Sequence, residues 1–174
     1  MNIKGDSVAL RAIEQTDATL LRELINDPET EKMLGGWSYP ISQSAQKDWI
    51  DGLVREQDVL RCIIETETPG EAIGTVILSS VDLKNGNAEV HLKIANGSSR
   101  GKGYGTDAIR AIVSYGFSEL RLRCIYANIV EYNEPSVKLF KKCGFELDGV
   151  LKERLFKNGK YINILVYSIL NNAI

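Results

Sequence analysis

The sequence has little of the residue types that build metal sites, disulfide frameworks or membrane spans. Of its 174 residues one is histidine and three are cysteine. These cysteines, Cys62, Cys124 and Cys143, lie far apart and show no metal-binding spacing. No apolar run approaches the ~20 residues that span a bilayer, and residues 1–6 lack the apolar core of a signal peptide. We therefore expect a cytoplasmic protein with free cysteines, no metal site and no membrane contact.

The chain also has no large excess of positive or negative charge. The formal net charge is -2 and the pI is about 5.6, which gives no electrostatic footprint for DNA or RNA. The hydrophobic share of 44% and the charged share of 25% are those of an ordinary globular protein. We find no linker, internal repeat or low-complexity tract, and the length suits one core. The sequence therefore predicts one domain over residues 1–174 and no nucleic-acid partner.

Hydrophobic periodicity predicts an α+β protein, because it alternates between strand-like and helix-like spacing along the chain. Turn signals at Pro69-Gly70 and Asn85-Gly86 separate three middle strands, which predicts an antiparallel meander. We expect these elements in chain order: a strand over 8–13, a helix capped by Thr16 or Asp17 and ended at 26–28, an irregular stretch over 33–40, a helix starting near Ser42 or Ser44, and strands over 59–65, 72–81 and 88–94.

The second half of the chain begins with a helical pattern after residue 106 and an apolar strand over 124–130. Asn133 is expected to cap a short helix with Pro135 in its first turn, and Gly144 to end it. Two final strands, 145–153 and 161–170, are expected to join through Asn158-Gly159.

The segment Arg100-Gly101-Lys102-Gly103-Tyr104-Gly105-Thr106 is the most informative stretch of the chain. Its glycines let the backbone turn tightly, and the helix that follows would offer unpaired N–H groups to an anion. The spacing does not fit a P-loop, and the dinucleotide fingerprint would need glycine where Thr106 stands. The loop therefore predicts a pyrophosphate cradle outside the two common nucleotide folds.

Two motifs together resemble those of the GNAT superfamily of N-acetyltransferases. The first is Arg-x-x-Gly-x-Gly from Arg100 to Gly105, and the second runs from Asn133 to Gly144-Phe145. The resemblance implies a layered α+β fold with a central mixed, mostly antiparallel sheet flanked by helices. It also implies acetyl-CoA as cosubstrate and direct transfer of the acetyl group to a primary amine in a ternary complex. A non-catalytic module that binds acyl-CoA is the alternative.

The C-terminal segment resembles two branches of that superfamily, the ribosomal-protein N-terminal acetyltransferases and the spermidine acetyltransferases. The acceptor is accordingly expected to be either a protein or peptide N-terminal amine or a small amine such as a polyamine. Glu23, Asp27, Glu29 and Glu31 could ring a polyamine or form a solvated helix end. A homo-oligomer is compatible with both branches.

The resemblance also implies a set of cofactor-binding residues. Backbone groups between Leu92 and Ala95 would pair with the pantetheine arm and polarise the thioester carbonyl, as an oxyanion hole does. Asn133 would lie near the pantetheine or would only cap its helix, and Arg100 and Lys102 would bind phosphates or be solvated. The complete set is Leu92, Lys93, Ile94, Ala95, Arg100, Gly101, Lys102, Gly103, Tyr104, Gly105, Thr106, Asn128, Asn133, Phe140 and Lys142.

Glu89 is the candidate catalytic base, because many relatives carry a glutamate at this strand position. It could instead form a cross-strand salt bridge. We expect His91 to be an exposed strand residue and Cys143 to be a packing residue. Phe140 stands where many relatives have a tyrosine that protonates the departing thiolate, so that proton must come from elsewhere. Trp37, Tyr39 and Trp49 could form either an acceptor-pocket wall or the core.

Overall fold

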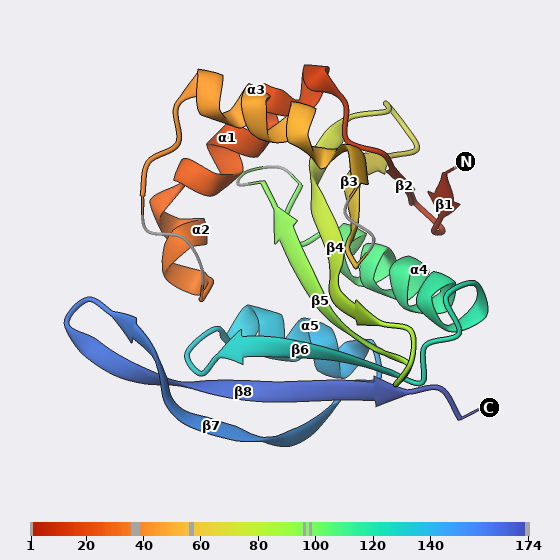
Figure 1. Ribbon diagram of the computed structural model, residues 1–174, viewed down its shortest axis with the longest axis vertical. Coiled ribbons are helices and arrows are strands. Elements are labelled where there is room, and N and C mark those ends of the chain that lie inside the picture. The colour runs from red at the N-terminus through yellow and green to blue at the C-terminus, as the bar shows by residue number, and fades with distance from the viewer. Residues whose placement is uncertain (1, 36–38, 56–57, 96, 98, 173–174) are drawn as a thin grey trace.

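The computed structural model describes residues 2–35, 39–55, 58–95, 97 and 99–172, and Figure 1 shows how their elements are arranged. The described strands form one eight-stranded sheet in the order β1-β2-β3-β4-β5-β6-β8-β7. Neighbouring strands are antiparallel except β5 and β6, which are parallel. The expected mixed, mostly antiparallel sheet is confirmed.

The elements alternate between strands and helices along the chain as the periodicity predicts. Their bounds are β1 Ile3–Lys4, β2 Val8–Arg11, α1 Ala18–Asn26, α2 Pro28–Met33, α3 Gln43–Asp51, β3 Leu60–Thr66, β4 Ala72–Asp82, β5 Asn87–Ile94, α4 Tyr104–Ser118, β6 Cys124–Val130, α5 Glu134–Lys142, β7 Glu146–Lys157 and β8 Lys160–Leu170, with 3-10 turns at Gln15–Asp17 and Gly52–Arg55.

The two central strands separate soon after they meet. β5 pairs with β6 only from Asn87 to Glu89, opposite Cys124 to Tyr126. Beyond that point β5 stays with β4, whereas β6 pairs with β8 along its whole length. The sheet therefore splits into two halves that diverge toward the end where α1 and α2 lie (Figure 1).

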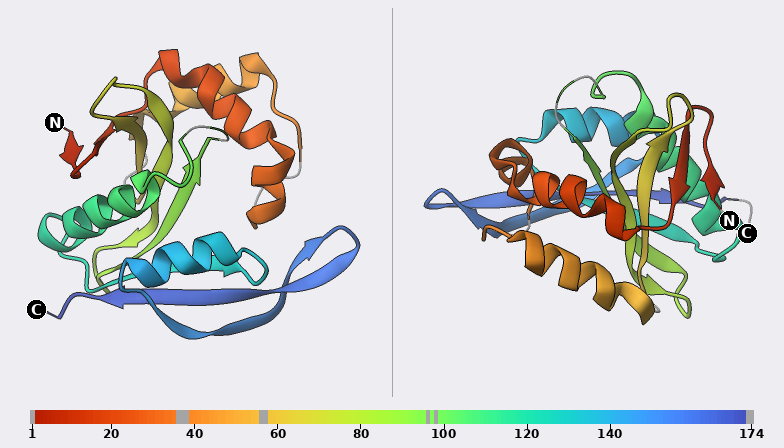
Figure 2. Two further views of the ribbon diagram at one scale, coloured as in Figure 1. Left: turned by 180° about the vertical axis from the view of Figure 1, so that it is seen from behind. Right: turned by 90° about the horizontal axis from the view of Figure 1, so that it is seen from above.

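Helices cover both faces of the β1–β5 half, as the two views in Figure 2 show. On one face α4 packs through Ala108, Ile109 and Ile112, which belong to the main core with β-strand residues such as Val76 and Val90. On the other face Ala18, Leu21 and Ile50 from α1 and α3 pack against Ile63. Successive strand residues point to opposite faces, and this accounts for the separation of Ile63 from its neighbours Cys62 and Ile64, which join the main core.

Several expected turns and caps are confirmed. The Ser42 side chain accepts from the Ala45 N–H at the start of α3, and Asn133 accepts from Ser136 at the start of α5. Gly144 follows α5 with a positive φ of 90°. Asn158 and Gly159 have φ values of 50° and 76° in the β7–β8 hairpin, the left-handed conformations that a tight hairpin turn needs.

Other expectations are wrong. The strand β1 and the helix α2 were not predicted, and β2 ends at Arg11 rather than at residue 13. Asp17 is the N-cap residue of α1, as expected, but its side chain makes no capping hydrogen bond to the helix. The Asp17 carboxylate instead accepts from the Arg11 guanidinium at 2.8 Å and from the Glu14 N–H at 2.8 Å. The ion pair with Arg11 thus takes the group that the sequence assigned to the helix start.

Helix α2 is held at its C-terminal end by three donors that are distant in sequence. The Tyr132 hydroxyl donates to the Lys32 carbonyl at 2.6 Å, and the Asn133 amide donates to the Met33 carbonyl at 2.9 Å. The Lys157 ammonium, 5% exposed, donates to the Glu31 carbonyl and lies 2.5 Å from the Glu31 carboxylate. A six-residue helix is too short to be stable alone, so we attribute its position to these contacts.

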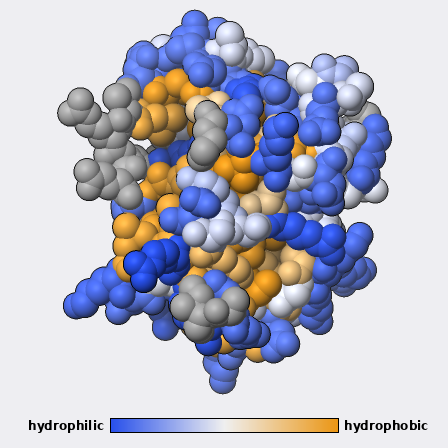
Figure 3. Space-filling model, turned by 90° about the vertical axis from the view of Figure 1, so that its right-hand side faces the viewer, coloured by the Kyte–Doolittle hydropathy of each residue, from blue (hydrophilic) through white to orange (hydrophobic). Residues whose placement is uncertain are grey.

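Among the described residues, no helix combines the length and the apolar composition needed to cross a membrane. On the side of the molecule shown in Figure 3, hydrophilic residues surround hydrophobic ones that are visible in the middle.

The first turn of α4 carries a carboxylate that fixes the β1–β2 turn. Asp107 accepts from the backbone N–H groups of Asp6, Ser7 and Val8 at 2.9, 2.7 and 3.0 Å. The Ser7 hydroxyl also donates to it at 2.9 Å. Burial favours the protonated form of Asp107, but these hydrogen bonds outweigh it and lower the pKa of this carboxyl.

Replacing Asp107 by asparagine should therefore lower the free energy of unfolding by about 1–3 kcal/mol at pH 7. Since the folded-state pKa is depressed, the contribution is present above the ordinary pKa of about 3.9 and is lost as the pH falls through the folded value. Urea unfolding of wild type and Asp107→Asn, from pH 7 down to pH 2, should show the difference shrinking. Asp48→Asn on α3 is the matched control, and an equal loss there would contradict the assignment.

Candidate active site

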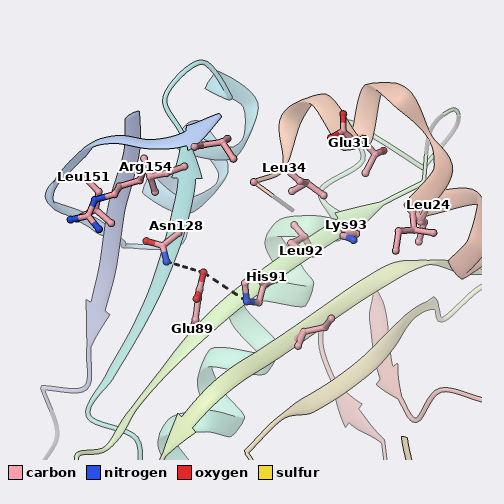
Figure 4. Close-up of a pocket in the computed structure, with 16 residues that line it drawn as sticks. Leu24, Glu31, Leu34, Glu89, His91, Leu92, Lys93, Asn128, Leu151 and Arg154 are labelled. Carbon is pink, nitrogen blue, oxygen red and sulfur yellow. Dashed lines mark hydrogen bonds and ion pairs between the residues drawn. The ribbon is translucent and has the colours of Figure 1, made fainter. Parts of the chain in front are cut away.

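A cavity of about 660 Å³ lies where the two halves of the sheet diverge. Figure 4 shows α1 and α2 on one side of it, β5 in the middle and β6 with the C-terminal hairpin on the other. Its lining residues are Leu24, Ile25, Thr30, Glu31, Leu34, Gly35, Ile77, Glu89, His91, Leu92, Lys93, Asn128, Leu151, Arg154, Leu155 and Ile164.

Polar side chains from β5 and β6 form a connected row on the wall of this cavity, and a β4 hydroxyl contacts the row from outside the lining. The Asn128 amide donates to Glu89 Oε1 at 2.9 Å. The same oxygen lies 3.8 Å from His91 Nε2, and that nitrogen is 2.7 Å from the Ser79 hydroxyl. Two of these contacts are dashed in Figure 4. The row places a carboxylate, 18% exposed, within reach of a ligand in the cavity.

His91 keeps much of the exposure expected of a strand residue, and it also faces the cavity. Its side chain is 42% exposed and lines the cavity. Burial lowers the pKa of His91, and the nearby Glu89 charge partly offsets this effect. Burial likewise lowers the pKa of Lys93 on the same face and raises the pKa of Tyr126, which pairs with Glu89 across the sheet.

The free edge of β5 offers backbone groups toward the gap. The Ala95 N–H donates to the Ile73 carbonyl at 2.8 Å, on the β4 side. Hydrogen-bonding directions alternate along an antiparallel strand, so the backbone groups of Leu92 and Ile94 point away from β4. Of the expected donors between Leu92 and Ala95, these two N–H groups face the gap and have no partner among the described residues, whereas the Ala95 N–H is bound to β4.

The three glycines of the loop have two different structural roles. Gly101 and Gly103 have φ values of 79° and 88°, and no atom lies within 4 Å of an added Cβ at either. Gly103 is the N-cap of α4. At Gly105, by contrast, an added Cβ would approach Leu139 to 3.0 Å and Leu92 to 3.1 Å. Gly105 thus permits close packing of α4, whereas the other two allow the turn and leave the cradle open.

Cations gather beside this helix start. A second cavity of about 210 Å³ is lined by Lys102, Gly103, Thr106, Arg110 and Lys142, with Asp6, Ser7 and Asp107. Lys142 comes from α5, so the two sequence motifs meet here. Three positive side chains next to the N-terminal N–H groups of a helix suit a phosphate group.

Three other expected cofactor residues have structural contacts of their own. The Arg100 guanidinium turns to the end of β5, where it donates to the Ile94 carbonyl at 3.0 and 3.2 Å and lies 3.4 Å from the Thr30 hydroxyl. Asn133 caps α5 and holds α2. Phe140 is 4% exposed and packs edge-to-face against Phe145, so the structure gives it a core position with little surface for a ligand.

The burial of Cys143 and the exposure of Tyr39 and Trp49 bear on the roles expected for them. Burial raises the pKa of the Cys143 thiol, which opposes thiolate formation and agrees with its expected packing role. Tyr39 is 72% exposed and Trp49 is 41% exposed, so neither is a core residue. Trp37 lies outside the described residues.

Three residues at or beside the site are not predicted from the sequence: Arg110, Ser79 and Arg154. Arg110 lies one helical turn after Thr106, and that i, i+4 spacing could have placed it beside the loop. Ser79 and Arg154 reach the site through the register of β4 and β7, both of which carry irregularities. Nothing in the local sequence marks such register shifts. Among the described residues, no group of three or more His, Cys, Asp or Glu side chains could hold a metal ion.

The family is decided by comparison with known domains. Residues 7–146 match the family model described as an acetyltransferase (GNAT) domain. The chain belongs to the GNAT N-acetyltransferases. This confirms the family and the fold indicated by the two motifs, and it makes the protein an enzyme of that class.

Relatives from both expected branches are similar to this GNAT chain. Spermidine N(1)-acetyltransferase of Escherichia coli K12 is 29% identical over 160 residues, which cover 91% of this chain and 83% of the relative. YdaF of Bacillus subtilis, named provisionally as a ribosomal N-acetyltransferase, is 29% identical over 172 residues, which cover 95% and 92%. The crystal structure of spermidine N-acetyltransferase from Vibrio cholerae in complex with CoA and spermine superposes with a TM-score of 0.86 at 26% identity, covering 94% of this chain and 95% of the other.

Proposed function

We propose that this protein transfers an acetyl group from acetyl-CoA directly to a primary amine, with both substrates bound at once. The observation that carries the proposal is the row of Asn128, Glu89 and His91 on the wall of a cavity that opens between β5 and β6. The phosphates of the donor fit the cationic pocket beside Gly103. The pantetheine and thioester then lie along the free edge of β5.

Glu89 is the base in this scheme. A protonated amine cannot attack, so the carboxylate takes one proton, directly or through water, before the C–N bond forms. The N–H groups of Leu92 and Ile94 are the candidates to stabilise negative charge on the carbonyl oxygen. The C–S bond then breaks, and the second amine proton is lost as the thiolate becomes a thiol.

No tyrosine is among the described residues that line the cavity, and Phe140 has no proton to give. We propose that water protonates the leaving thiolate. A thiol with a pKa near 8.5 is a fair leaving group, so this step needs no dedicated acid. The acceptor is a peptide amine or a small amine, and a homo-oligomer stays a prediction.

The test is thermal unfolding of the purified protein with and without acetyl-CoA. At a ligand concentration of about 100 times Kd, binding adds about 2.7 kcal/mol, which for a chain of this size raises the Tm by roughly 5–10 °C. Release of free CoA on adding a mixed amine panel then establishes the transfer. An unchanged Tm at millimolar acetyl-CoA would contradict the proposal.

A further inference from the structure

The acceptor side of the cavity carries two cationic side chains, those of Lys93 and Arg154. Lys93 and Arg154 both line the cavity, and within the described part of the chain neither forms an ion pair. The two lining carboxylates are already engaged, since Glu31 pairs with Lys157 and Glu89 accepts from Asn128. A bound anion would find two unpaired cations here.

Lys93 lies on the same face of β5 as Glu89 and His91, because residues two apart in a strand point the same way. Its side chain is therefore near the proposed position of the thioester, between the open N–H groups of Leu92 and Ile94. Figure 4 shows its ammonium on the α1 side of the strand. Burial disfavours the charged form of an unpaired lysine, so a carboxylate from a ligand would relieve that cost.

A smaller apolar cavity of about 320 Å³ adjoins this point. It shares Leu24, Ile25, Ile77 and Lys93 with the main cavity, and it continues between α1 and α3. Its other lining residues are mostly apolar: Ile13, Leu21, Ile41, Ala45, Gln46, Trp49 and Thr75. We call it the side cavity. Lys93 stands at the junction, with the reacting end of the main cavity on one side and apolar walls on the other.

We propose that the acceptor is an amino acid with a large apolar side chain. Its amine lies near Glu89, its carboxylate binds Lys93, and its side chain enters the side cavity. This inference rests on the proposed function. The product is an N-acetyl amino acid and free CoA: the C–N bond forms and the C–S bond breaks. One amine proton goes to Glu89, and the second passes through water to the departing thiolate.

The same charges disfavour a polyamine. Spermine bears cations along its whole length, and in this cavity it would meet Lys93 and Arg154. Of the two carboxylates that line the main cavity, Glu31 is already paired with Lys157, and Glu89 is left to receive the one amine that reacts. Glu23 and Asp27, the other acidic candidates, line a different cavity. The acceptor of this chain thus differs in charge from that of the spermidine acetyltransferases to which it is similar.

The test measures CoA release with leucine, phenylalanine, their amides, alanine and spermidine as acceptors. A hydrogen-bonded charge pair contributes about 1.5–3 kcal/mol, so kcat/KM for leucine should exceed that for leucinamide and spermidine by at least about tenfold. In Lys93→Met the acid-to-amide ratio should fall to near one, mainly through KM. The acetyl-CoA shift in Tm should persist, because Lys93 would contact the donor only through its backbone. Lys84→Met, in the exposed β4–β5 turn, is the matched control and should keep the ratio.

A second variant tests the side cavity independently. Ala45→Phe places a ring in it from an exposed position on α3, and should lower kcat/KM for leucine and phenylalanine at least about tenfold while sparing alanine. If leucinamide or spermidine is acetylated as well as leucine, this inference is overturned and the proposed function stands. If acetyl-CoA does not raise the Tm and no amine releases CoA, both fall.

Discussion

Replacing Glu89 by glutamine should lower kcat/KM by about 10²–10⁴-fold, the range that one positioned acid or base contributes. Glutamine keeps an oxygen that can accept from Asn128, so the hydrogen bond of 2.9 Å and the wall of the cavity should persist. What is lost is the ability to take a proton from the amine. Steady-state rates of CoA release across pH 6–9, with acetyl-CoA saturating, give the measurement.

The matched control is Glu131→Gln. Glu131 also accepts from an asparagine side chain, that of Asn163, at 3.0 Å, but it does not line the cavity. Its variant should retain activity within about twofold, and both variants should keep the acetyl-CoA shift in Tm. Activity of Glu89→Gln at the wild-type level over the whole pH range would remove Glu89 as the base.

Replacing Gly103 by valine should weaken acetyl-CoA binding by more than about 100-fold. Its φ of 88° is a conformation that a β-branched residue avoids, so the backbone at the start of α4 would have to rotate. That rotation redirects the N–H groups that we assign to the pyrophosphate, and the new side chain occupies open space beside Lys102 and Arg110. Isothermal titration with acetyl-CoA gives the affinity.

Gly70→Val separates this effect from backbone strain alone. Gly70 has a φ of 85° and equally open surroundings, but it lies in the turn between β3 and β4. Both variants should lose about 1–3 kcal/mol of stability, and only Gly103→Val should lose the ligand. Wild-type affinity in Gly103→Val would refute the loop assignment.

Much of the site could be predicted from sequence because it depends on local patterns. Strand alternation in β5 accounts for Val90 in the core, with Leu92 and Ile94 packed against it, and for Glu89 on the opposite face. The two motifs correctly identified the helix starts of α4 and α5. These features are set by residues a few positions apart, where strand and helix periods apply directly.

The features of the site that could not be predicted from the sequence depend on contacts between residues far apart in the chain. The hydroxyl of Ser79 reaches His91 only because of the pairing of β4 with β5. Gly103 and Gly105 belong to one motif, yet only the packed structure shows that the first turns the chain and the second fits against Leu139. Helix α2 has no apolar periodicity, so the sequence predicts no helix over its six residues.

The contacts that hold α2 have a consequence for how this enzyme could diverge. Tyr132, Asn133 and Lys157 all donate to main-chain oxygens of residues 31–33. Every residue type supplies such an oxygen. Mutations in the outward side chains of this helix can thus accumulate without displacing the helix. If the cavity binds the acceptor as proposed, its α2 wall is free to change chemistry during evolution while the gap between β5 and β6 keeps its width.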